Sequence, residues 1–156
     1  MNNRYPYLPE GREIKHVPAT NIFMAEAMNM RNNFSTDAGH PTGAVGVLGN
    51  DIIVKDANQS KLKNKKLIEF HKSAFCVRKF FKIKTGTKYW MCPGCATHHQ
   101  HSESRVAEGL IKKGVKGADL YLYGHWWCCK PCWDAMIKAG IKDVYLLDNA
   151  EELFKR

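Results

Sequence analysis

The sequence lacks long apolar runs. No stretch of its 156 residues approaches the roughly 20 consecutive apolar residues that a transmembrane helix requires. The opening segment, MNNRYPYLPEGREIKHVP (1–18), also lacks the apolar core of a secretory signal peptide. These absences predict that the protein has no membrane partner. They also predict that it is located in the cytoplasm, or in the host cytoplasm if the source is viral. Cytoplasmic thiols stay reduced, so the six cysteines are expected to be metal ligands or buried thiols rather than disulfides.

Acidic residues are scarce by comparison with basic ones. The chain contains 24 Lys and Arg against 15 Asp and Glu, which gives a formal net charge of +9 and a pI near 9.3. Much of the excess lies in KLKNKKLIEFHKSAFCVRKFFKIKTGTK (61–88), where aromatic residues alternate with lysines. Such a segment favours anionic partners, and nucleic acid is not excluded, although a solvated basic face is the simpler interpretation.

The order of the expected elements predicts an α/β fold. Length favours a single domain over 1–156, with a basic, cysteine-containing insertion at about 59–100. Helices are expected at 18–31, 67–81, 103–114, 129–140 and 150–156. Strands are expected at 43–48, 51–58, 118–127 and 141–148. Thr20 is expected to cap the first helix, and the alternation of strands and helices implies a sheet with some parallel pairing.

Two short motifs indicate a zinc site. Cys129 and Cys132 form C-x-x-C at the start of an expected helix, where the helix N-terminus stabilises the thiolate that binds metal. C-x-x-C alone also occurs in redox proteins. Upstream, His101 and Glu103 form H-x-E, and H-x-E followed by C-x-x-C is typical of zinc deaminases, in which the glutamate is not a ligand. Three protein ligands leave the fourth zinc position open, as catalysis requires.

Longer segments resemble one protein family. LYGHWWCCKPCWDAMIKAGIKDVYLL (122–147) resembles the L-Y-x-x-x-x-P-C-x-x-C…AGI-x-x-V segment of the cytidine and deoxycytidylate deaminase superfamily. CVRKFFKIKTGTKYWMC (76–92), followed by HSE (101–103), is similar to the C-x-R…S-G-T-R-Y-E-x-C…H-A-E stretch of microbial and phage deoxycytidylate deaminases. The similarity spans roughly residues 20–148. It implies the cytidine-deaminase-like fold, a three-layer α/β/α sandwich around a mixed sheet of about five strands.

The resemblance also implies the chemistry of the site. His101, Cys129 and Cys132 would bind a catalytic Zn²⁺, which makes hydroxide available near neutral pH. Glu103 would move protons between the water, the pyrimidine ring and the leaving amine. The implied activity is hydrolytic deamination of dCMP to dUMP and ammonia, a step of pyrimidine deoxynucleotide metabolism that supplies dUMP for dTMP synthesis.

Further residues would contact the substrate. By resemblance, Asn58 would bind the sugar, the backbone of Ser102 would bind the base, and Trp126 would lie against the pyrimidine ring. Arg105 stands where the family has an asparagine. An arginine there could hold a phosphate, although a solvated surface charge is the commoner role of a helical arginine.

Partners and alternatives follow from the same comparison. Members of the family form homo-oligomers, often hexamers, and some are regulated by dCTP and dTTP with Mg²⁺. The resemblance therefore allows for an allosteric nucleotide site in this chain. One alternative is a deaminase of another cytosine or adenine carrier, such as a nucleoside, a modified nucleotide or single-stranded nucleic acid. Another is a non-catalytic, zinc-stabilised binding module. Glu103 argues against this module, because a carboxylate beside an open zinc site has no structural role.

A second group of possible ligands lies in the insertion. Cys76, Cys92 and Cys95 are close in sequence to His98, and CPGC followed by THH approaches a zinc-knuckle spacing. A second, structural zinc would order the insertion, because metal binding contributes directly to folding free energy. The alternative is that Cys76 and Cys92 are buried thiols and that the nearby histidines line the mouth of the active site. Isolated histidines such as His71 carry no assignment, and Trp127 is expected to be a core or interface residue.

Overall fold

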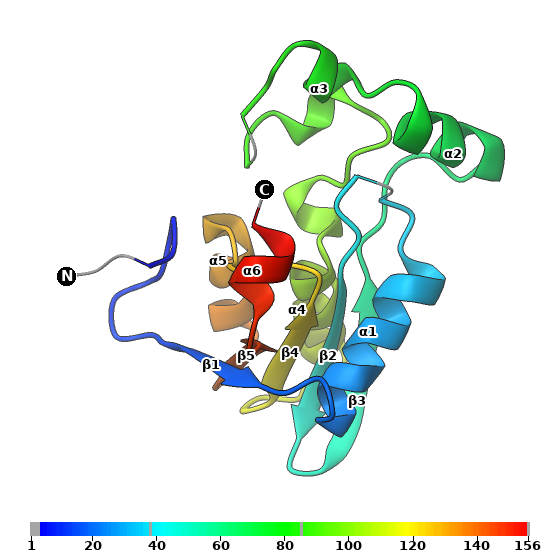
Figure 1. The fold of residues 1–156 in the computed structure, drawn as a ribbon. Coiled ribbons are helices and arrows are strands. Elements are labelled where there is room, and N and C mark those ends of the chain that lie inside the picture. The colour runs from blue at the N-terminus through cyan, green and yellow to red at the C-terminus, as the bar shows by residue number, and fades with distance from the viewer. Residues whose placement is uncertain (1–3, 38, 85, 156) are drawn as a thin grey trace.

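A five-stranded mixed sheet forms the centre of the computed structural model, which describes residues 4–37, 39–84 and 86–155 (Figure 1). The strands are β1 (Ile14–Val17), β2 (Gly43–Leu48), β3 (Asp51–Ala57), β4 (Asp119–Tyr123) and β5 (Val144–Leu147). Their order across the sheet is β1-β5-β4-β2-β3. β1, β5 and β4 are parallel, whereas β2 is antiparallel to both β4 and β3. The two strands expected at 43–48 and 51–58 therefore form an antiparallel hairpin, β2–β3.

Helices cover both faces of this sheet. The main ones are α1 (Ile22–Phe34), α4 (Ser102–Lys112) and α5 (Lys130–Lys138), with a short α6 (Ala150–Phe154) near the end of the chain. A Cβ atom on Gly43 would lie 2.2 Å from the carbonyl oxygen of Ala27 in α1, whereas one on Gly46 would lie 3.0 Å from Val106 in α4. Positions 43 and 46 face opposite sides of a strand. α1 and α4 therefore pack on opposite faces, and the predicted three-layer α/β/α sandwich is confirmed.

The N-cap of the first helix lies one residue later than predicted. Asn21, not Thr20, is its N-cap, and its side-chain oxygen accepts hydrogen bonds from the amides of Phe23 at 3.0 Å and Met24 at 3.1 Å. These bonds satisfy two of the amides that the first turn leaves without a helical partner. The helix then buries a stripe of apolar side chains against the sheet.

The sequence pattern does not predict β1. Its residues, IKHV, include two polar side chains, and the strand pairs only with β5 at the edge of the sheet. An edge strand can expose polar side chains to solvent at little cost in stability. Its sequence therefore shows little alternation of apolar and polar residues. Lys15 uses this exposure to pair with Asp143 at 3.0 Å.

The insertion forms a separate lobe whose ends meet. The amide of Gln59 donates to the carbonyl of Gln100 at 3.0 Å, so the segment leaves and rejoins the sandwich at one place. It contains α2 (Lys65–Ser73), α3 (Val77–Phe80), and the 3₁₀ helices η1 (Tyr89–Met91) and η2 (His98–Gln100). In Figure 1, α2 and α3 lie beyond the sheet, apart from its covering layers.

A single helix over 67–81 was expected in this lobe, and the structure corrects this expectation. The chain leaves the helical conformation after Ser73 and is extended at Cys76, with φ −126° and ψ 121°. The break turns the Cys76 side chain inward, where it is buried against two other cysteines. A tertiary contact thus overrides local helix propensity.

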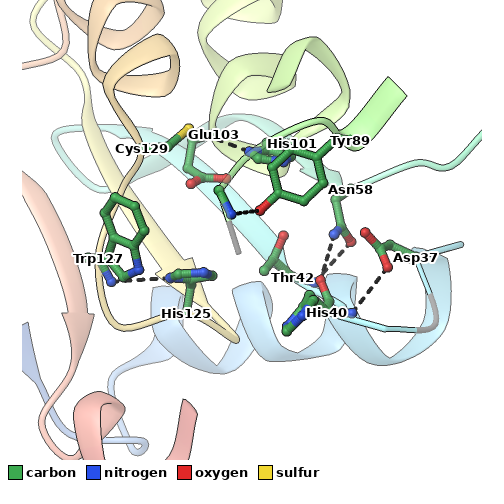
Figure 2. Close-up of a pocket in the computed structure, with 11 residues that line it drawn as sticks. Asp37, His40, Thr42, Asn58, Tyr89, His101, Glu103, His125, Trp127 and Cys129 are labelled. Carbon is green, nitrogen blue, oxygen red and sulfur yellow. Dashed lines mark hydrogen bonds between the residues drawn. The ribbon is translucent and has the colours of Figure 1, made fainter. Parts of the chain in front are cut away.

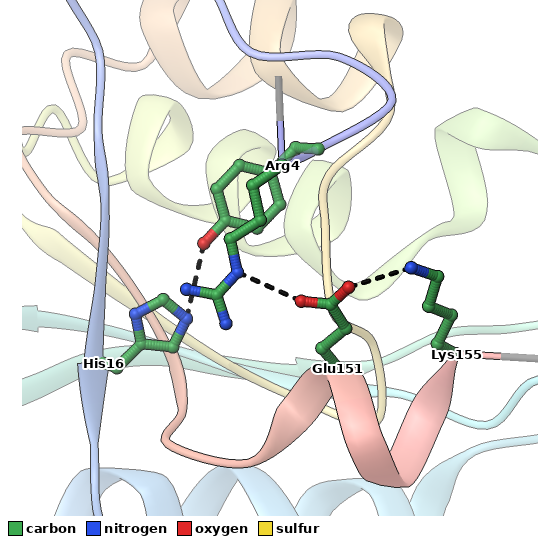
Figure 3. Close-up of polar contacts among 5 residues, drawn as sticks. Arg4, His16, Glu151 and Lys155 are labelled. Carbon is green, nitrogen blue, oxygen red and sulfur yellow. Dashed lines mark hydrogen bonds and ion pairs between the residues drawn. The ribbon is translucent and has the colours of Figure 1, made fainter. Parts of the chain in front are cut away.

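The segment before β1 folds back along the molecule (Figure 3). Arg4 Nε lies 3.0 Å from one carboxylate oxygen of Glu151 in α6, and Lys155 Nζ lies 2.8 Å from the other. The hydroxyl of Tyr5 lies 3.4 Å from Nε2 of His16 in β1. These contacts tie the segment to both α6 and the edge of the sheet. In the described residues, no helix has the length and apolar character needed to cross a bilayer.

Candidate functional site

Three potential zinc ligands meet at the N-terminal ends of two helices. His101 directly precedes α4, Cys129 directly precedes α5, and Cys132 lies in the first turn of α5. His101 Nδ1 is 3.7 Å from Cys129 Sγ and 3.4 Å from Cys132 Sγ, and the two sulfur atoms are 3.2 Å apart. Tetrahedral zinc with bonds of about 2.3 Å to sulfur and 2.0 Å to nitrogen separates such ligand atoms by roughly 3.5 Å. The three residues therefore fit one zinc ion.

The two cysteine side chains are hydrogen-bonded to each other. This hydrogen bond lowers the pKa of Cys129 to about 4, and the nearby His101 adds to this effect. The same hydrogen bond, together with burial, raises the pKa of Cys132. One sulfur is thus already a thiolate near neutral pH. Binding of a divalent cation needs the release of only one further thiol proton.

Glu103 lies in the first turn of α4 and faces the same space as the ligands (Figure 2). Its carboxyl group is buried, and this burial raises its pKa, against the opposing effect of His101. The hydroxyl of Ser102 donates a hydrogen bond to its Oε2 atom at 3.1 Å. Glu103 is not among the residues whose ligand atoms converge on the metal position. A carboxyl group with a raised pKa is suited to accept and return a proton.

The pocket around Glu103 is built from three distant parts of the chain (Figure 2). These are the ends of the β2–β3 hairpin, the insertion, and the loop between β4 and α5. Its lining residues are Asp37, His40, Thr42, Asn58, Gly86, Tyr89, His101, Glu103, His125, Trp127 and Cys129. The cavity volume is about 30 Å³, which leaves room for about two water molecules. The pocket is therefore too small for a pyrimidine in this conformation.

His125 lines the pocket, although no sequence motif assigns it a role. Its Nδ1 atom accepts hydrogen bonds from the backbone amides of Trp126 at 3.1 Å and Trp127 at 3.3 Å. Burial, together with the nearby His101 and His40, lowers its pKa to about 4. A neutral imidazole that accepts at Nδ1 carries its proton on Nε2. His125 thus offers the pocket one uncharged N–H donor.

Asn58 lines the pocket and also holds its walls together. Its Oδ1 atom accepts hydrogen bonds from the amide of Thr42 at 2.9 Å and from the hydroxyl of Ser35. Its Nδ2 atom donates to the carbonyl of His40 at 2.7 Å. Among the described residues, one of the two amide N–H groups is thereby used, and the other is left for a ligand.

The structure does not bring Arg105 to the pocket. Arg105 lies two residues beyond Glu103 on α4, which is about 200° around the helix, so the two side chains leave on different faces. Its Nη2 atom pairs with Asp56 at the end of β3 at 2.9 Å. The phosphate role considered for Arg105 is therefore not supported. Ser102 is fully buried, and its hydroxyl lies 2.8 Å from that of Thr42.

Trp127, and not Trp126, lines the pocket. Two hydrogen bonds to His125 hold the turn between β4 and α5. Trp126 lies near Tyr5, with 6.4 Å between ring centroids, and under the ammonium of Lys155 at 4.8 Å. The structure therefore places Trp127 in the pocket, whereas the expected residue, Trp126, lines only the outer cleft.

A second space, the outer cleft, continues from the mouth of the pocket. It shares His40, Gly86, His125 and Trp127 with the pocket. The complete lining of the outer cleft is Pro6, His40, Lys84, Gly86, Thr87, His125, Trp126, Trp127 and Phe154. Among the described residues that line either space, Lys84 is the only lysine or arginine. A ligand with its reactive end in the pocket would meet this cation at its outer end.

The insertion holds a second group of ligand atoms, the cysteine cluster of His71, Cys76, Cys92 and Cys95. Cys76 Sγ is 3.9 Å from Cys92 Sγ and 3.8 Å from Cys95 Sγ, and His71 Nε2 is 3.7 Å from Cys95 Sγ. All four residues are buried, and their ligand atoms lie within 4.8 Å of one another. Three sulfurs and one imidazole nitrogen form a complete tetrahedral set, which is typical of structural zinc sites.

The histidine of this cluster is His71, and the expected ligand His98 is not part of it. His98 packs against His99 with 4.1 Å between ring centroids and the rings tilted by 46°, and it lines a cleft beside α4 and α5. Gly94 makes room for His71, since a Cβ atom at that position would lie 2.3 Å from the imidazole ring. The signal in the sequence was the short spacing between His71 and Cys76. The sixth cysteine, Cys128, is fully buried in the main core and belongs to neither ligand set.

One family of known proteins matches most of the chain. A family model, the cytidine and deoxycytidylate deaminase zinc-binding region, matches residues 19–148. Among solved structures, dCMP deaminase from the cyanophage S-TIM5 in apo form is similar, with 17% identity over 85% of this chain and 86% of that chain and a TM-score of 0.46. Its complex with dCMP and dUMP is similar at 15% identity over 84% of each chain, also with a TM-score of 0.46. No curated protein is significantly similar in sequence.

Proposed function

The chain belongs to the cytidine and deoxycytidylate deaminase family, and we propose that the substrate of this zinc-dependent hydrolytic deaminase is dCMP, which it converts to dUMP and ammonia. The observation that carries the proposal is the buried carboxyl group of Glu103, which shares the pocket with the His101, Cys129 and Cys132 ligand set without belonging to it.

The proposed reaction assigns proton transfer to Glu103. His101, Cys129 and Cys132 would hold the zinc, which would supply an activated water near neutral pH. Glu103 accepts a proton from the attacking water and delivers it to N3 of the cytosine ring. It then moves a proton to the amino group on C4, which leaves as ammonia. Its raised pKa supports both directions of transfer.

Other pocket residues would orient the nucleotide. The Nε2–H group of His125 is a neutral donor, suited to the carbonyl oxygen of the pyrimidine. The indole of Trp127 would stack on the ring. The remaining N–H group of Asn58 would donate to the sugar, in agreement with the role expected from the sequence. Lys84, in the outer cleft, would contact the 5′-phosphate.

We propose that the cysteine cluster binds a second, structural zinc. Its four ligands leave no open position, in contrast to the three ligands beside Glu103. The lobe that contains the cluster has few buried apolar side chains of its own, so a metal would supply much of its stability.

Assembly and regulation belong to the same proposal and are supported by family membership alone. We expect a homo-oligomer, with the hexamer of some relatives as one form, and control by dCTP and dTTP with Mg²⁺. Analytical ultracentrifugation with and without these nucleotides, paired with activity measurements, tests both points. A monomer that is indifferent to dCTP and dTTP would contradict them.

The experiment that tests the substrate is a measurement of ammonia release. Zinc-loaded protein is presented separately with dCMP, dCTP, deoxycytidine, adenosine and a cytosine-containing single strand. We expect turnover of dCMP well above that of the others. Preference for a nucleoside, a triphosphate or the polymer would replace dCMP with that carrier, and absence of all turnover would favour a non-catalytic module.

A further inference from the structure

The net positive charge of the protein comes from one segment. Residues 61–88 contain ten of the 24 Lys and Arg residues and one of the 15 Asp and Glu residues. The rest of the chain therefore contains 14 of each kind, and its formal net charge is zero. The whole excess of +9 belongs to this part of the insertion, which carries α2 and α3. A charge so localised creates a field that attracts anions to one face of the molecule.

The same segment exposes aromatic side chains. Phe75, Phe80 and Phe81 are 43%, 66% and 62% exposed. The ring centroid of Phe80 lies 5.5 Å from that of Phe75 and 5.1 Å from that of Phe81. Phe70 and Trp90 are 55% and 72% exposed. Exposed aromatic clusters are uncommon on monomeric proteins and mark interaction sites.

We define the insertion surface as these aromatic residues together with the exposed lysines of α2, α3 and their flanks. Its members are Lys63, Lys65, Lys66, Phe70, Lys72, Phe75, Lys79, Phe80, Phe81, Lys82 and Trp90. The lobe that carries them lies beyond the sandwich in Figure 1, so the layers of the main fold do not cover it.

We propose that the insertion surface binds single-stranded nucleic acid. Its lysines neutralise backbone phosphates, and its phenylalanines provide faces on which unpaired bases stack. Bases in a duplex are already stacked on one another, so the exposed aromatic residues specify a single strand. A second copy of the chain is a poorer occupant, because two such surfaces in contact would bring together two charges of +9.

The surface adjoins the pocket without forming part of it. The chain continues from Lys82 through Lys84 to Gly86 and Tyr89, which line the outer cleft and the pocket. A bound strand therefore lies near the mouth of the pocket. The proposal that the insertion surface binds a single strand goes beyond the proposed deamination of dCMP. Binding and ammonia release are measured separately, so either proposal can fail without the other.

Fluorescence anisotropy of short fluorescein-labelled oligothymidylate and oligouridylate with the zinc-loaded, full-length protein tests the proposal. We expect the logarithm of the affinity to fall linearly with the logarithm of the salt concentration. Lys79→Gln with Lys82→Gln should lower this slope by about one for each lost phosphate contact. Phe80→Ala with Phe81→Ala should weaken binding by about tenfold or more at constant slope.

The matched control is Lys112→Gln with Lys113→Gln, which removes two exposed lysines from the neutral part of the chain. This control should leave the affinity and the slope unchanged, and all variants should retain the ammonia release of the parent. Equal weakening by the control, equal binding of a duplex, or unchanged binding after loss of Phe80 and Phe81 would overturn the proposal. So would an oligomer in ultracentrifugation that dissociates when Phe80 and Phe81 are replaced, because a second copy would then occupy the surface.

Discussion

The guanidinium group of Arg78 lies over the ring of Tyr89, 4.1 Å from its centroid. Arg78 is buried and lies 3.8 Å from Cys95 Sγ on one side, while Tyr89 and the imidazole of His101 form a T-shaped pair on the other, with 5.3 Å between centroids. Arg78 also donates hydrogen bonds to the carbonyls of Thr87 at 3.1 Å and Lys84 at 3.2 Å. A continuous set of contacts thus joins the cysteine cluster to the proposed zinc ligands.

Replacement of Arg78 should damage the pocket at a distance. Arg78→Lys keeps the charge but loses the planar fork that holds the two carbonyls and the Tyr89 ring. We expect kcat/KM for dCMP to fall about tenfold, mainly through KM, with the zinc content unchanged. Steady-state kinetics and metal analysis check this outcome. Lys79→Gln, an exposed neighbour, serves as the control, and an unchanged KM in Arg78→Lys would show that the contacts do not position the pocket wall.

Glu103→Gln should separate chemistry from metal binding. The amide has nearly the same shape as the carboxyl group but cannot accept and return a proton. We expect kcat to fall by about 10²–10⁴-fold, while the zinc at His101, Cys129 and Cys132 is retained. Ammonia release and metal content are measured on the same preparation. Full turnover by this variant would remove Glu103 from the proposed mechanism.

Metal content tests the cysteine cluster. The proposal predicts two zinc ions per chain in the parent protein and one in Cys92→Ser, together with lower thermal stability of the insertion. Cys128→Ser is the matched control, because Cys128 is also a buried thiol but lies outside both ligand sets. Mass spectrometry under native conditions counts the ions. Equal zinc content in Cys92→Ser and the parent would mean that the cluster consists of buried thiols.

Lys84 should distinguish a nucleotide from a nucleoside. Lys84→Ala removes the cation of the outer cleft, so the specificity constant for dCMP should fall by about tenfold or more, as expected for a hydrogen bond to a charged group. The rate with deoxycytidine should not change. Lys82→Ala provides a neighbouring control. Equal losses on both substrates would assign Lys84 to the pocket wall rather than to the phosphate.

His125 should make the fold sensitive to acid. Its pKa is about 4 in the folded protein and about 6.5 in an unfolded chain, so the unfolded state binds more protons between these values. The effect of His125 on the free energy of unfolding is therefore absent above pH 6.5. As the pH falls to 4, this effect lowers the free energy of unfolding by about 3 kcal/mol. His125→Asn keeps an acceptor for the two backbone amides. Denaturant titrations across this range should show a smaller pH dependence in the variant than in the parent, whereas identical pH profiles would contradict the assignment.

Periodicity predicts most of the sandwich because its helices and strands bury one regular stripe or face. It fails where the structure depends on a single tertiary contact. The break at Cys76 exists because the side chain meets Cys92 and Cys95, and no local pattern marks it. β1 is not predicted because a polar edge strand does not require apolar and polar residues to alternate.

Motif spacing predicts which residues meet at the ends of α4 and α5, because both motifs begin a helix and both helices start at the same edge of the sheet. It cannot choose between Trp126 and Trp127, since the choice depends on hydrogen bonds to His125. It also could not choose His71 over His98. That selection follows from the packing of α2 against the glycine of CPGC, a contact between separate segments.

The small volume of the pocket has a consequence for the timing of the proposed reaction. A Cβ atom on Gly86 would lie 4.0 Å from the indole of Trp127, so the insertion and the β4–α5 loop lie close together beside the pocket. A pyrimidine needs several times the cavity volume of about 30 Å³. Binding of the proposed substrate would therefore require these two segments to move apart, and release of uracil would require the same movement. The frequency of this movement would then set an upper limit on turnover, however fast the proton transfers become.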